Sequence, residues 1–231
     1  MIDFTTLDTI TTDLLNIIRN FGVSRSENIS KRQIEMWVHQ HRAILIKQDI
    51  DKGKIPNPDY IQSIPSLQLE VVDESDGGDI ESDSYILRTQ LEIPKTLDLN
   101  FKSGFTYIGT IDGNEIQFIP EGRRKWQQYK KYTKNDNLAF LRDNKLYLIY
   151  PKPIQQITVK GIFEVPTEVM NIVNSHYTPT EGGWSDPYPI PINMLPTLKE
   201  MILKKELGIG VSALSDNKND SSNFVSKDIT S

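Results

Sequence analysis

The first fifty residues carry two helical patterns of apolar positions. Apolar residues recur at three- and four-residue steps from Leu7 onward, which predicts a helix over about 7–20 with Gly22 as its stop. A second helix is predicted between Ser30 and Gly53. Its start is indicated by Ser30 and Gln33, which form a capping box, and its end by Gly53.

The second predicted helix is apolar on two sides, so both sides must be covered. Two explanations remain open at this point. Either the helix lies at the centre of its own bundle, or one stripe meets a neighbouring subunit. The first stripe comprises Ile34, Trp37, Val38, His41 and Leu45, and the second comprises Met36, Ala43, Ile46 and Ile50.

After Pro56 and Pro58 the apolar pattern changes to a period of two, which is typical of strands. Short alternating segments between turn signals predict an antiparallel β region over about 64–166. Asp112-Gly113 and Asp143-Asn144 each separate two such segments and predict hairpins. The expected strands cover about 67–72, 85–93, 105–110, 115–119, 138–141, 145–150 and 155–165, the last of which ends at Pro166.

Residues 167–191 are rich in Pro, Gly, Asn and aromatic residues, which predicts a loop. A final helix is predicted over about 193–207, closed by Gly208, and the polar residues 211–231 are predicted to be a flexible tail. The predicted fold is therefore α+β, a helical part with an inserted antiparallel β domain. The expected units are a helical pair (1–58), a β domain (59–166), a loop and helix packed on the N-terminal helices (167–210), and a flexible or docking tail (211–231).

Composition removes several classes of function. The 231 residues carry a formal charge of only −5, which argues against a protein whose whole surface grips nucleic acid. The absence of cysteine excludes disulfides, thiol nucleophiles and thiolate metal sites. No apolar run in the sequence approaches the length of a membrane span, and residues 1–19 lack the basic region of a signal peptide. We therefore expect a soluble protein, made in a cytoplasm, with no membrane partner.

None of the candidate motifs for chemistry has the spacing or the structural context that its chemistry requires. His39 and His41 are two positions apart and face opposite sides of a helix, so they cannot share a metal. The Gly208-Ile209-Gly210 run resembles a dinucleotide fingerprint but follows a helix instead of a strand. We predict no catalytic residue, no cofactor and no metal. A hydrolase with carboxylates that converge only in three dimensions stays open, without a motif in its favour.

Residues 123–134 form a basic segment in which three aromatic residues are interleaved and no acid occurs. Three explanations remain open: a solvated connector anchored by its aromatics, a nucleic-acid contact, or a contact with an acidic partner. The basic residues are Arg123, Arg124, Lys125, Lys130, Lys131 and Lys134.

The chain itself supplies an acidic partner in the loop 73–83, which misses the spacing of a calcium loop. A head-to-tail ring needs two different patches that meet between successive copies, and the acidic loop and basic segment would serve. The acidic residues are Asp73, Glu74, Asp76, Asp79, Glu81 and Asp83.

Several motifs between about 60 and 166 carry a resemblance to a known family. They are Tyr85-Ile86-Leu87-Arg88-Thr89, Leu91-Glu92-Ile93-Pro94, the Asp112-Gly113 hairpin, Lys130-Lys131-Tyr132-Thr133, Asn144-Lys145-Leu146-Tyr147-Leu148 and Gly161-Ile162-Phe163-Glu164-Val165-Pro166. This stretch resembles a structural protein of crAss-like bacteriophages. The layout of the chain also resembles the head–tail connector, or tail adaptor, proteins of short-tailed phages.

The resemblance implies a non-enzymatic virion protein of the phage neck or tail, assembled in the host bacterial cytoplasm. The adaptor proteins that the chain resembles form a ring, commonly twelvefold. This ring joins the portal protein to neighbouring tail ring proteins around the DNA channel. Proteins of this kind often dock an extended segment onto the portal, for which Phe224, Val225 and Ile229 are the candidates. The alternative function is a DNA-binding module that acts through residues 123–134.

Overall fold

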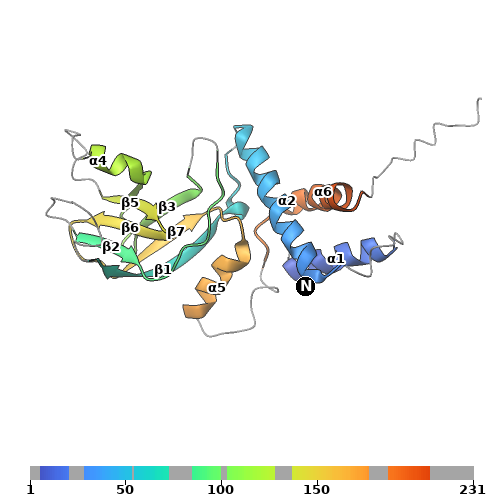
Figure 1. Ribbon diagram of the computed structural model, residues 1–231, viewed down its shortest axis with the longest axis horizontal. Coiled ribbons are helices and arrows are strands. Elements are labelled where there is room, and N and C mark those ends of the chain that lie inside the picture. Colours follow the sequence, from blue (N-terminus) through green and yellow to red (C-terminus); the bar gives the residue numbers. More distant parts are fainter. Residues whose placement is uncertain are drawn as a thin grey trace, which may run out of the picture.

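The computed structural model describes residues 6–20, 29–53, 55–72, 85–99, 103–127, 137–176 and 187–208. These residues form an elongated molecule with a helical part at one end and a β part at the other (Figure 1). A long helix, α2 (Lys31–Asp51), forms the side of the helical part that lies next to the β part. The predicted α+β fold class is confirmed.

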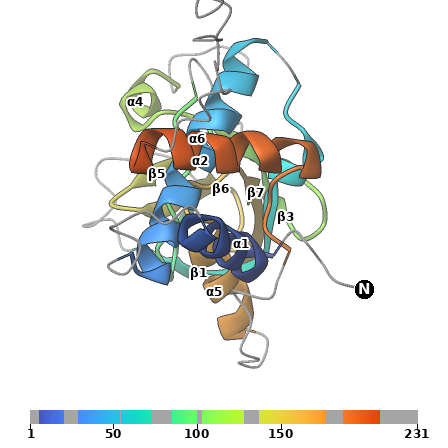
Figure 2. The same ribbon diagram turned by 90° about the vertical axis from the view of Figure 1, so that its right-hand side faces the viewer.

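Three helices build the helical part: α1 (Leu7–Asn20), α2 and α6 (Leu195–Leu207), which confirms the three predicted helices. Figure 2 shows α1 and α6 on the same side of α2. Most of the stability of helices in proteins comes from packing their apolar sides, and these three bury theirs against one another. The shared core includes Leu7, Ile10, Leu14, Ile18, Ile34, Trp37, Val38, Leu45, Leu198 and Ile202.

The helix ends follow the sequence signals. The Ser30 side chain accepts a hydrogen bond from the Gln33 backbone N–H at 3.2 Å, as the capping box predicts. Gly53 and Gly208 follow α2 and α6 with φ values of +79° and +62°, a left-handed conformation that glycine adopts without strain. Local chemistry therefore determines where these helices begin and end.

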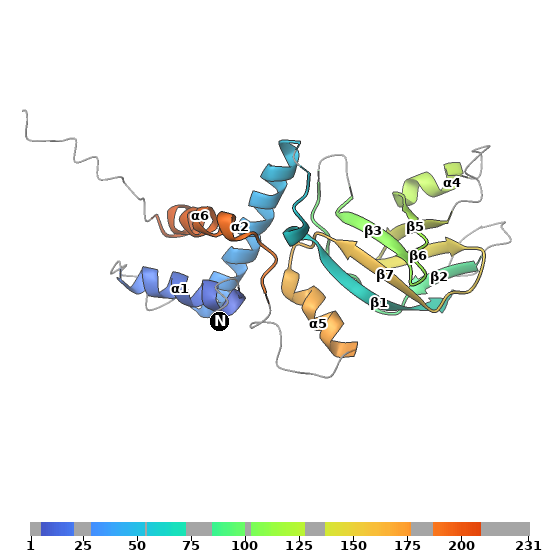
Figure 3. The same ribbon diagram turned by 180° about the vertical axis from the view of Figure 1, so that it is seen from behind.

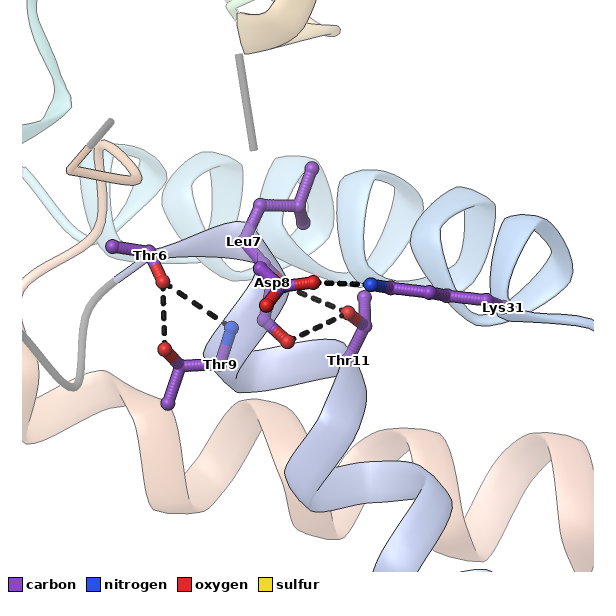
Figure 4. Close-up of polar contacts among 6 residues, drawn as sticks. All are labelled: Thr6, Leu7, Asp8, Thr9, Thr11 and Lys31. Atoms are coloured by element: carbon purple, nitrogen blue, oxygen red, sulfur yellow. Dashed lines mark hydrogen bonds and ion pairs between the residues drawn. The ribbon is translucent and has the colours of Figure 1, made fainter. Parts of the chain in front are cut away.

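The start of α1 is held by side chains that the apolar pattern does not reveal. Thr6 Oγ1 accepts a hydrogen bond from the Thr9 backbone N–H at 3.2 Å, and Thr11 Oγ1 donates to the Asp8 carbonyl at 3.0 Å (Figure 4). Lys31, at the start of α2, forms an ion pair with Asp8. The first turns of α1 and α2 are thus tied together.

The β part is a seven-stranded sheet in the order β3-β7-β1-β2-β6-β5-β4. All pairs of neighbouring strands are antiparallel except β4 with β5, which is parallel. The prediction of a wholly antiparallel region is therefore wrong for β4. The strands are β1 (Gln62–Val71), β2 (Tyr85–Thr89), β3 (Phe105–Thr110), β4 (Gln117–Phe118), β5 (Leu138–Arg142), β6 (Lys145–Tyr150) and β7 (Gln156–Gly161).

The two edge strands of this sheet, β3 and β4, meet each other. Gly109 and Glu115 form an antiparallel bridge, and the Ile116 N–H donates to the Ile108 carbonyl at 2.8 Å. The sheet therefore curls so that its first and last strands touch. After the turn, residues 115 and 116 pair with β3, and the chain continues directly into β4, which pairs with β5 in parallel.

Both predicted turns are present. Asp143 and Asn144 have φ values of +50° and +58° and join β5 to β6, as expected of a two-residue hairpin turn. Gly113, with φ +87°, lies in the turn between β3 and β4. The ladder beyond Gly113 is shorter than predicted, because the strand expected over 115–119 is reduced to β4.

Two other predicted strands are too long and one begins too late. The strand expected over 85–93 ends at Thr89, and the strand expected over 155–165 ends at Gly161. β1 begins at Gln62, five residues earlier than the predicted strand, and is irregular between Ile64 and Leu67. Ile93 is nevertheless only 4% exposed. An apolar pattern reports burial, and buried residues continue past the end of a strand.

The loop predicted over 167–191 is wrong for its first ten residues, which belong to α5 (Pro166–His176). Pro166 was interpreted as the end of a strand, yet proline also fits the first position of a helix, where its missing N–H costs nothing. Val169 is 2% exposed and packs into the core of the sheet. Figure 3 shows α5 beside β1.

The second apolar stripe of α2 faces the β part. Ile46 and Ile50 pack with Tyr60, Leu97 and Ile162 in a cluster separate from the core of the helical part. The chain itself therefore covers the C-terminal half of this stripe, which agrees with the explanation that needs no neighbouring subunit, although strands and connections do the covering. Met36, near the other end of the stripe, is 49% exposed.

Candidate interaction surfaces

The junction between the two parts is organised around Arg42 of α2, which is fully buried. Its guanidinium donates to the carbonyls of Pro189 at 2.8 Å, Phe163 at 2.9 Å and Tyr60 at 3.5 Å. These carbonyls belong to the segments that enter β1, leave β7 and lead to α6. One side chain thus binds three separate passages of the chain between the helical part and the β part.

Aromatic rings and a histidine complete this junction. The Arg42 guanidinium carbon lies 5.6 Å from the centre of the Tyr188 ring, and the Tyr188 hydroxyl is hydrogen bonded to His39 Nδ1 at 2.8 Å. Burial lowers the pKa of Arg42 and raises the pKa of Tyr188. Burial, followed by the positive charge of Arg42, lowers the pKa of His39 to about 4, so His39 is neutral at pH 7.

The two histidines of α2 face different neighbours, as their spacing predicts. His39 contacts Tyr188, whereas His41 Nε2 lies 2.9 Å from Glu206 Oε1 on α6. Both histidines are buried packing residues that link α2 to other segments. Within the described part of the chain, no three His, Asp or Glu side chains gather in a way that could hold a metal ion.

Arg123, Arg124 and Trp126, at the start of the basic segment, form an exposed surface on the β part that we call the platform. Arg123 is exposed, and Arg124 begins the short helix α4 (Arg124–Gln127). The Arg124 guanidinium carbon lies 5.3 Å from the centre of the Phe140 ring on β5. Trp126, in the same helical turn, is 70% exposed. A solvent-facing tryptophan beside arginines is the composition that protein interfaces favour.

Arg142 belongs to the same platform and was not predicted from the sequence. It binds Glu121 Oε1 through Nε at 2.6 Å, and its guanidinium carbon lies 5.6 Å from the Tyr147 ring centre. Burial, together with the nearby charge of Arg142, lowers the pKa of Arg124. Arg142 stands just before the Asp143-Asn144 turn, and the pairing of β5 with β4, which leads into the basic segment, brings it to the platform.

Two described residues next to the charged segments pack in one hydrophobic cluster. Val72, the last described residue before the acidic loop, packs in a cluster with Ile119, which precedes the basic segment. Phe140, the ring beneath Arg124, is in the same cluster. The acidic loop itself lies outside the described residues, so its contact with the basic segment stays a prediction.

Most of the other predicted contact residues lie outside the described residues, so their placement stays a prediction. Lys125 is within α4, but its side chain is not among those described. The residues outside the described ranges are Lys130, Lys131 and Lys134, the acids Asp73, Glu74, Asp76, Asp79, Glu81 and Asp83, and the tail residues Phe224, Val225 and Ile229.

Exposed large apolar side chains occur in both parts of the molecule. Apolar residues that are exposed singly are normal on a protein surface, so their number alone does not mark a contact surface. Trp126 differs from the others because it lies beside the arginines of the basic segment. The exposed residues of the β part are Val71, Tyr85, Leu91, Ile111 and Trp126, and the others are Met36, Ile44, Ile55 and Ile192.

Comparison with known proteins agrees with an interpretation based on surfaces. Residues 9–229 match the family described as phage tail ring protein 2, which is almost the whole chain. Comparison with curated proteins finds no match. No helix among the described residues is both long and apolar enough to cross a lipid bilayer. The chain, with its helical part, closed sheet and charged platform, belongs to the crAss-like phage tail ring protein 2 family.

Proposed function

We propose that this structural protein of a phage tail ring forms a homo-oligomeric ring that connects the portal to the tail and surrounds the DNA channel. The observation that carries the proposal is the family match over residues 9–229. The ring is twelvefold, as in the adaptor proteins that the layout resembles. It assembles in the host cytoplasm, contacts the portal and neighbouring ring proteins, and acts through its surfaces without catalysing a reaction.

Contacts between copies are made by the charged segments of the β part. Val72 and Ile119, which adjoin the acidic loop and the basic segment, pack in one cluster of the β part. In a head-to-tail ring the acidic loop of one copy meets the basic segment of the next. Opposite charges set the register of such a contact more than its strength.

Charge reversal tests this arrangement. We expect the combined change of Arg123, Arg124 and Lys125 to Glu to leave monomers at physiological salt, measured by light scattering. The matched control reverses Arg19, Arg32 and Lys52, three exposed bases of the helical part and its edge, with the same change in net charge. A circular dichroism spectrum checks that each variant is folded. If the first variant assembles like the control, the charged segments do not hold the ring together.

A complementary variant sharpens the test. Changing Asp73, Glu74 and Asp76 to Lys gives a second chain that should also stay monomeric. A mixture of the two reversed chains restores opposite charges at the contact. We expect the mixture to assemble while each chain alone does not, and negative-stain images of the mixture should show rings.

The tail carries a second set of contacts. Phe224, Val225 and Ile229 dock onto the portal or a neighbouring ring, and the surrounding polar residues become ordered on binding. Deletion of residues 211–231 should abolish stacking onto a neighbouring ring and leave the fold intact. Co-sedimentation with the portal protein measures the first effect, and thermal unfolding measures the second.

DNA binding is the second candidate function, and the exposure of Arg123 and Trp126 in adjacent helical turns favours it. Basic side chains bind phosphates and aromatic rings stack on bases. A gel-shift titration over a salt series separates the two functions. Binding at physiological salt that weakens steeply as salt rises favours a DNA-binding module. Ring assembly without DNA binding favours the structural function.

A further inference from the structure

Residues of α5, the start of β1 and the segment 187–192 line a cleft of about 660 Å³ at the waist of the molecule. Figure 3 shows where α5 and β1 lie. We call it the waist cleft. It lies outside the charged surface on which the proposed ring contact rests. Its apolar lining comprises Ile61, Val169, Met170, Val173, Ile190 and Ile192.

Two features of the waist cleft indicate that an extended peptide would fit it. Ile192 is 66% exposed, so the lining presents apolar surface to water. Gln62, which also lines the cleft, donates through Nε2 to the Pro166 carbonyl at 3.2 Å, while its buried Oε1 has no hydrogen-bond partner. A bound backbone supplies N–H donors that suit such an acceptor once the Gln62 side chain turns towards the cleft, and leaving a buried polar atom unpaired is unfavourable.

The chain provides a segment with matching chemistry. After Leu214, the only large apolar residues are Phe224, Val225 and Ile229, and Lys227 lies between them. Asp59 is exposed and lines the waist cleft. The apolar residues match the lining, and Lys227 is complementary in charge to Asp59, although Asp228 beside it leaves the segment without net charge.

The length of the tail allows this segment to reach the cleft. From Ile192 at the cleft, the chain runs through a short 3-10 helix and α6 to Gly208, a distance of about 25 Å at the rises of these helices. Phe224 lies 16 positions after Gly208, and an extended chain of that length spans about 50 Å. The tail can therefore fold back along α6, and its tether gives a local concentration on the order of millimolar.

We infer that residues 224–229 dock in the waist cleft of their own chain, with Phe224 and Val225 against its apolar lining and Lys227 beside Asp59. This inference goes beyond the proposed ring and does not depend on it. It gives the tail a binding site on its own chain. A portal or neighbouring ring must displace the tail from this site before it can bind the same residues. The tail would thus be shielded until the ring meets its partner.

Engineered disulfides test the inference in the full-length chain, which contains no cysteine of its own. The test variant carries Ile192→Cys with Val225→Cys, and a second carries Met170→Cys with Val225→Cys in case one substitution disturbs folding. The control carries Met36→Cys with Val225→Cys. Met36 is 49% exposed on α2 and lies outside the cleft, and its helix contacts α6 near the start of the tail.

Each variant is oxidised in a glutathione buffer at a concentration where light scattering shows monomers. Circular dichroism of the reduced form checks the fold, and a non-reducing gel with peptide mass spectrometry measures the cross-link. We expect at least tenfold more intramolecular disulfide in a cleft pair than in the control. Equal amounts in folded variants would overturn the inference. Disulfide-linked dimers would overturn the same-chain assignment and give the cleft to the tail of another copy.

Discussion

The helical part buries titratable side chains of α2, whereas the β part keeps two arginines at its surface. On α2, His39, His41 and Arg42 are 8%, 3% and 0% exposed, and each has a hydrogen-bond partner. On the β part, Arg124 and Arg142 stay at the surface and lie against aromatic rings. A buried charge is unfavourable unless its hydrogen bonds are made, so the first arrangement favours one geometry. In the second arrangement the arginines pack on rings at the surface, Arg142 is paired with Glu121, and the exposed Trp126 lies nearby.

This difference separates two tasks of a ring subunit. The junction around Arg42 holds the helical part and the β part in one orientation, which identical copies need if they are to close a ring. The platform around Trp126 is suited to contacts between molecules. Three experiments, from the largest expected effect to the smallest, test whether the two regions differ as described.

Removal of the buried charge should have the largest effect. Arg42→Met leaves the carbonyls of Pro189, Phe163 and Tyr60 without their donor, and we expect it to lower the free energy of unfolding by roughly 3–5 kcal/mol. Arg42→Lys should lower the free energy of unfolding by less than Arg42→Met does. It still lowers it, because one ammonium group cannot reproduce the planar set of donors. Urea unfolding followed by tryptophan fluorescence measures these changes.

Arg32→Met is the matched control for this experiment, because Arg32 is an exposed arginine of the same helix. We expect a change below about 0.5 kcal/mol. If Arg42→Met destabilises the protein no more than Arg32→Met, the junction does not depend on the buried guanidinium. Small-angle X-ray scattering of folded Arg42→Lys would also show whether the two parts lose their fixed orientation.

The neutral His39 makes stability depend on pH. Its pKa is about 4 in the folded protein against an ordinary value of 6.5, so between these values the unfolded chain binds a proton that the folded chain does not. Stability therefore falls as the pH drops from 6.5 towards 4, by about 3 kcal/mol in full. We expect His39→Gln to lose about 2 kcal/mol less than the natural chain between pH 7 and pH 4.5, measured by urea unfolding.

Neighbouring groups enter this pH profile. Glu35 Oε1 lies 3.6 Å from His39 Nε2, and burial raises the pKa of Glu35, so Glu35 contributes in the opposite direction as the pH falls. Arg42 and Tyr188 also face His39, and both keep their ordinary protonation states in this range. Glu35→Gln should therefore steepen the loss of stability. An unchanged profile in His39→Gln would show that other groups cause the acid dependence.

The closing turn of the sheet should give the smallest effect. Gly113 has φ +87°, where an L side chain is strained, so Gly113→Ala should lower the free energy of unfolding by about 1–2 kcal/mol. Gly122→Ala, at an open position without positive φ, should change it by less than about 0.5 kcal/mol. Thermal unfolding of the two variants gives the comparison, and equal midpoints would show that the turn does not constrain the sheet.

Local patterns predicted much of the secondary structure. The Ser30 cap, the Gly53 and Gly208 ends and the Asp143-Asn144 turn are correct because each depends on residues only a few positions apart. α5 was missed because Pro166 is compatible with two interpretations, a strand end and a helix start. Only the packing of Val169 against the sheet distinguishes them.

The junction and the platform could not be predicted, because their partners are distant in sequence. Arg42 meets carbonyls 18, 121 and 147 positions away, and Arg142 binds Glu121 across 21 positions. In sequence, Arg42 is one more polar residue of an amphipathic helix. Part of the platform was visible as a basic and aromatic run, but its support by Phe140 depends on how β5 pairs.

The sequence by itself determined the helices, the turns and the charged segments, since periodicity, caps and turn residues act over one or two turns of chain. Tertiary structure decided the order of the strands, the meeting of β3 with β4 and the burial of Arg42. These features depend on which distant surfaces exclude water from one another. Many pairings satisfy the same local pattern, and only the packing of the whole chain selects among them.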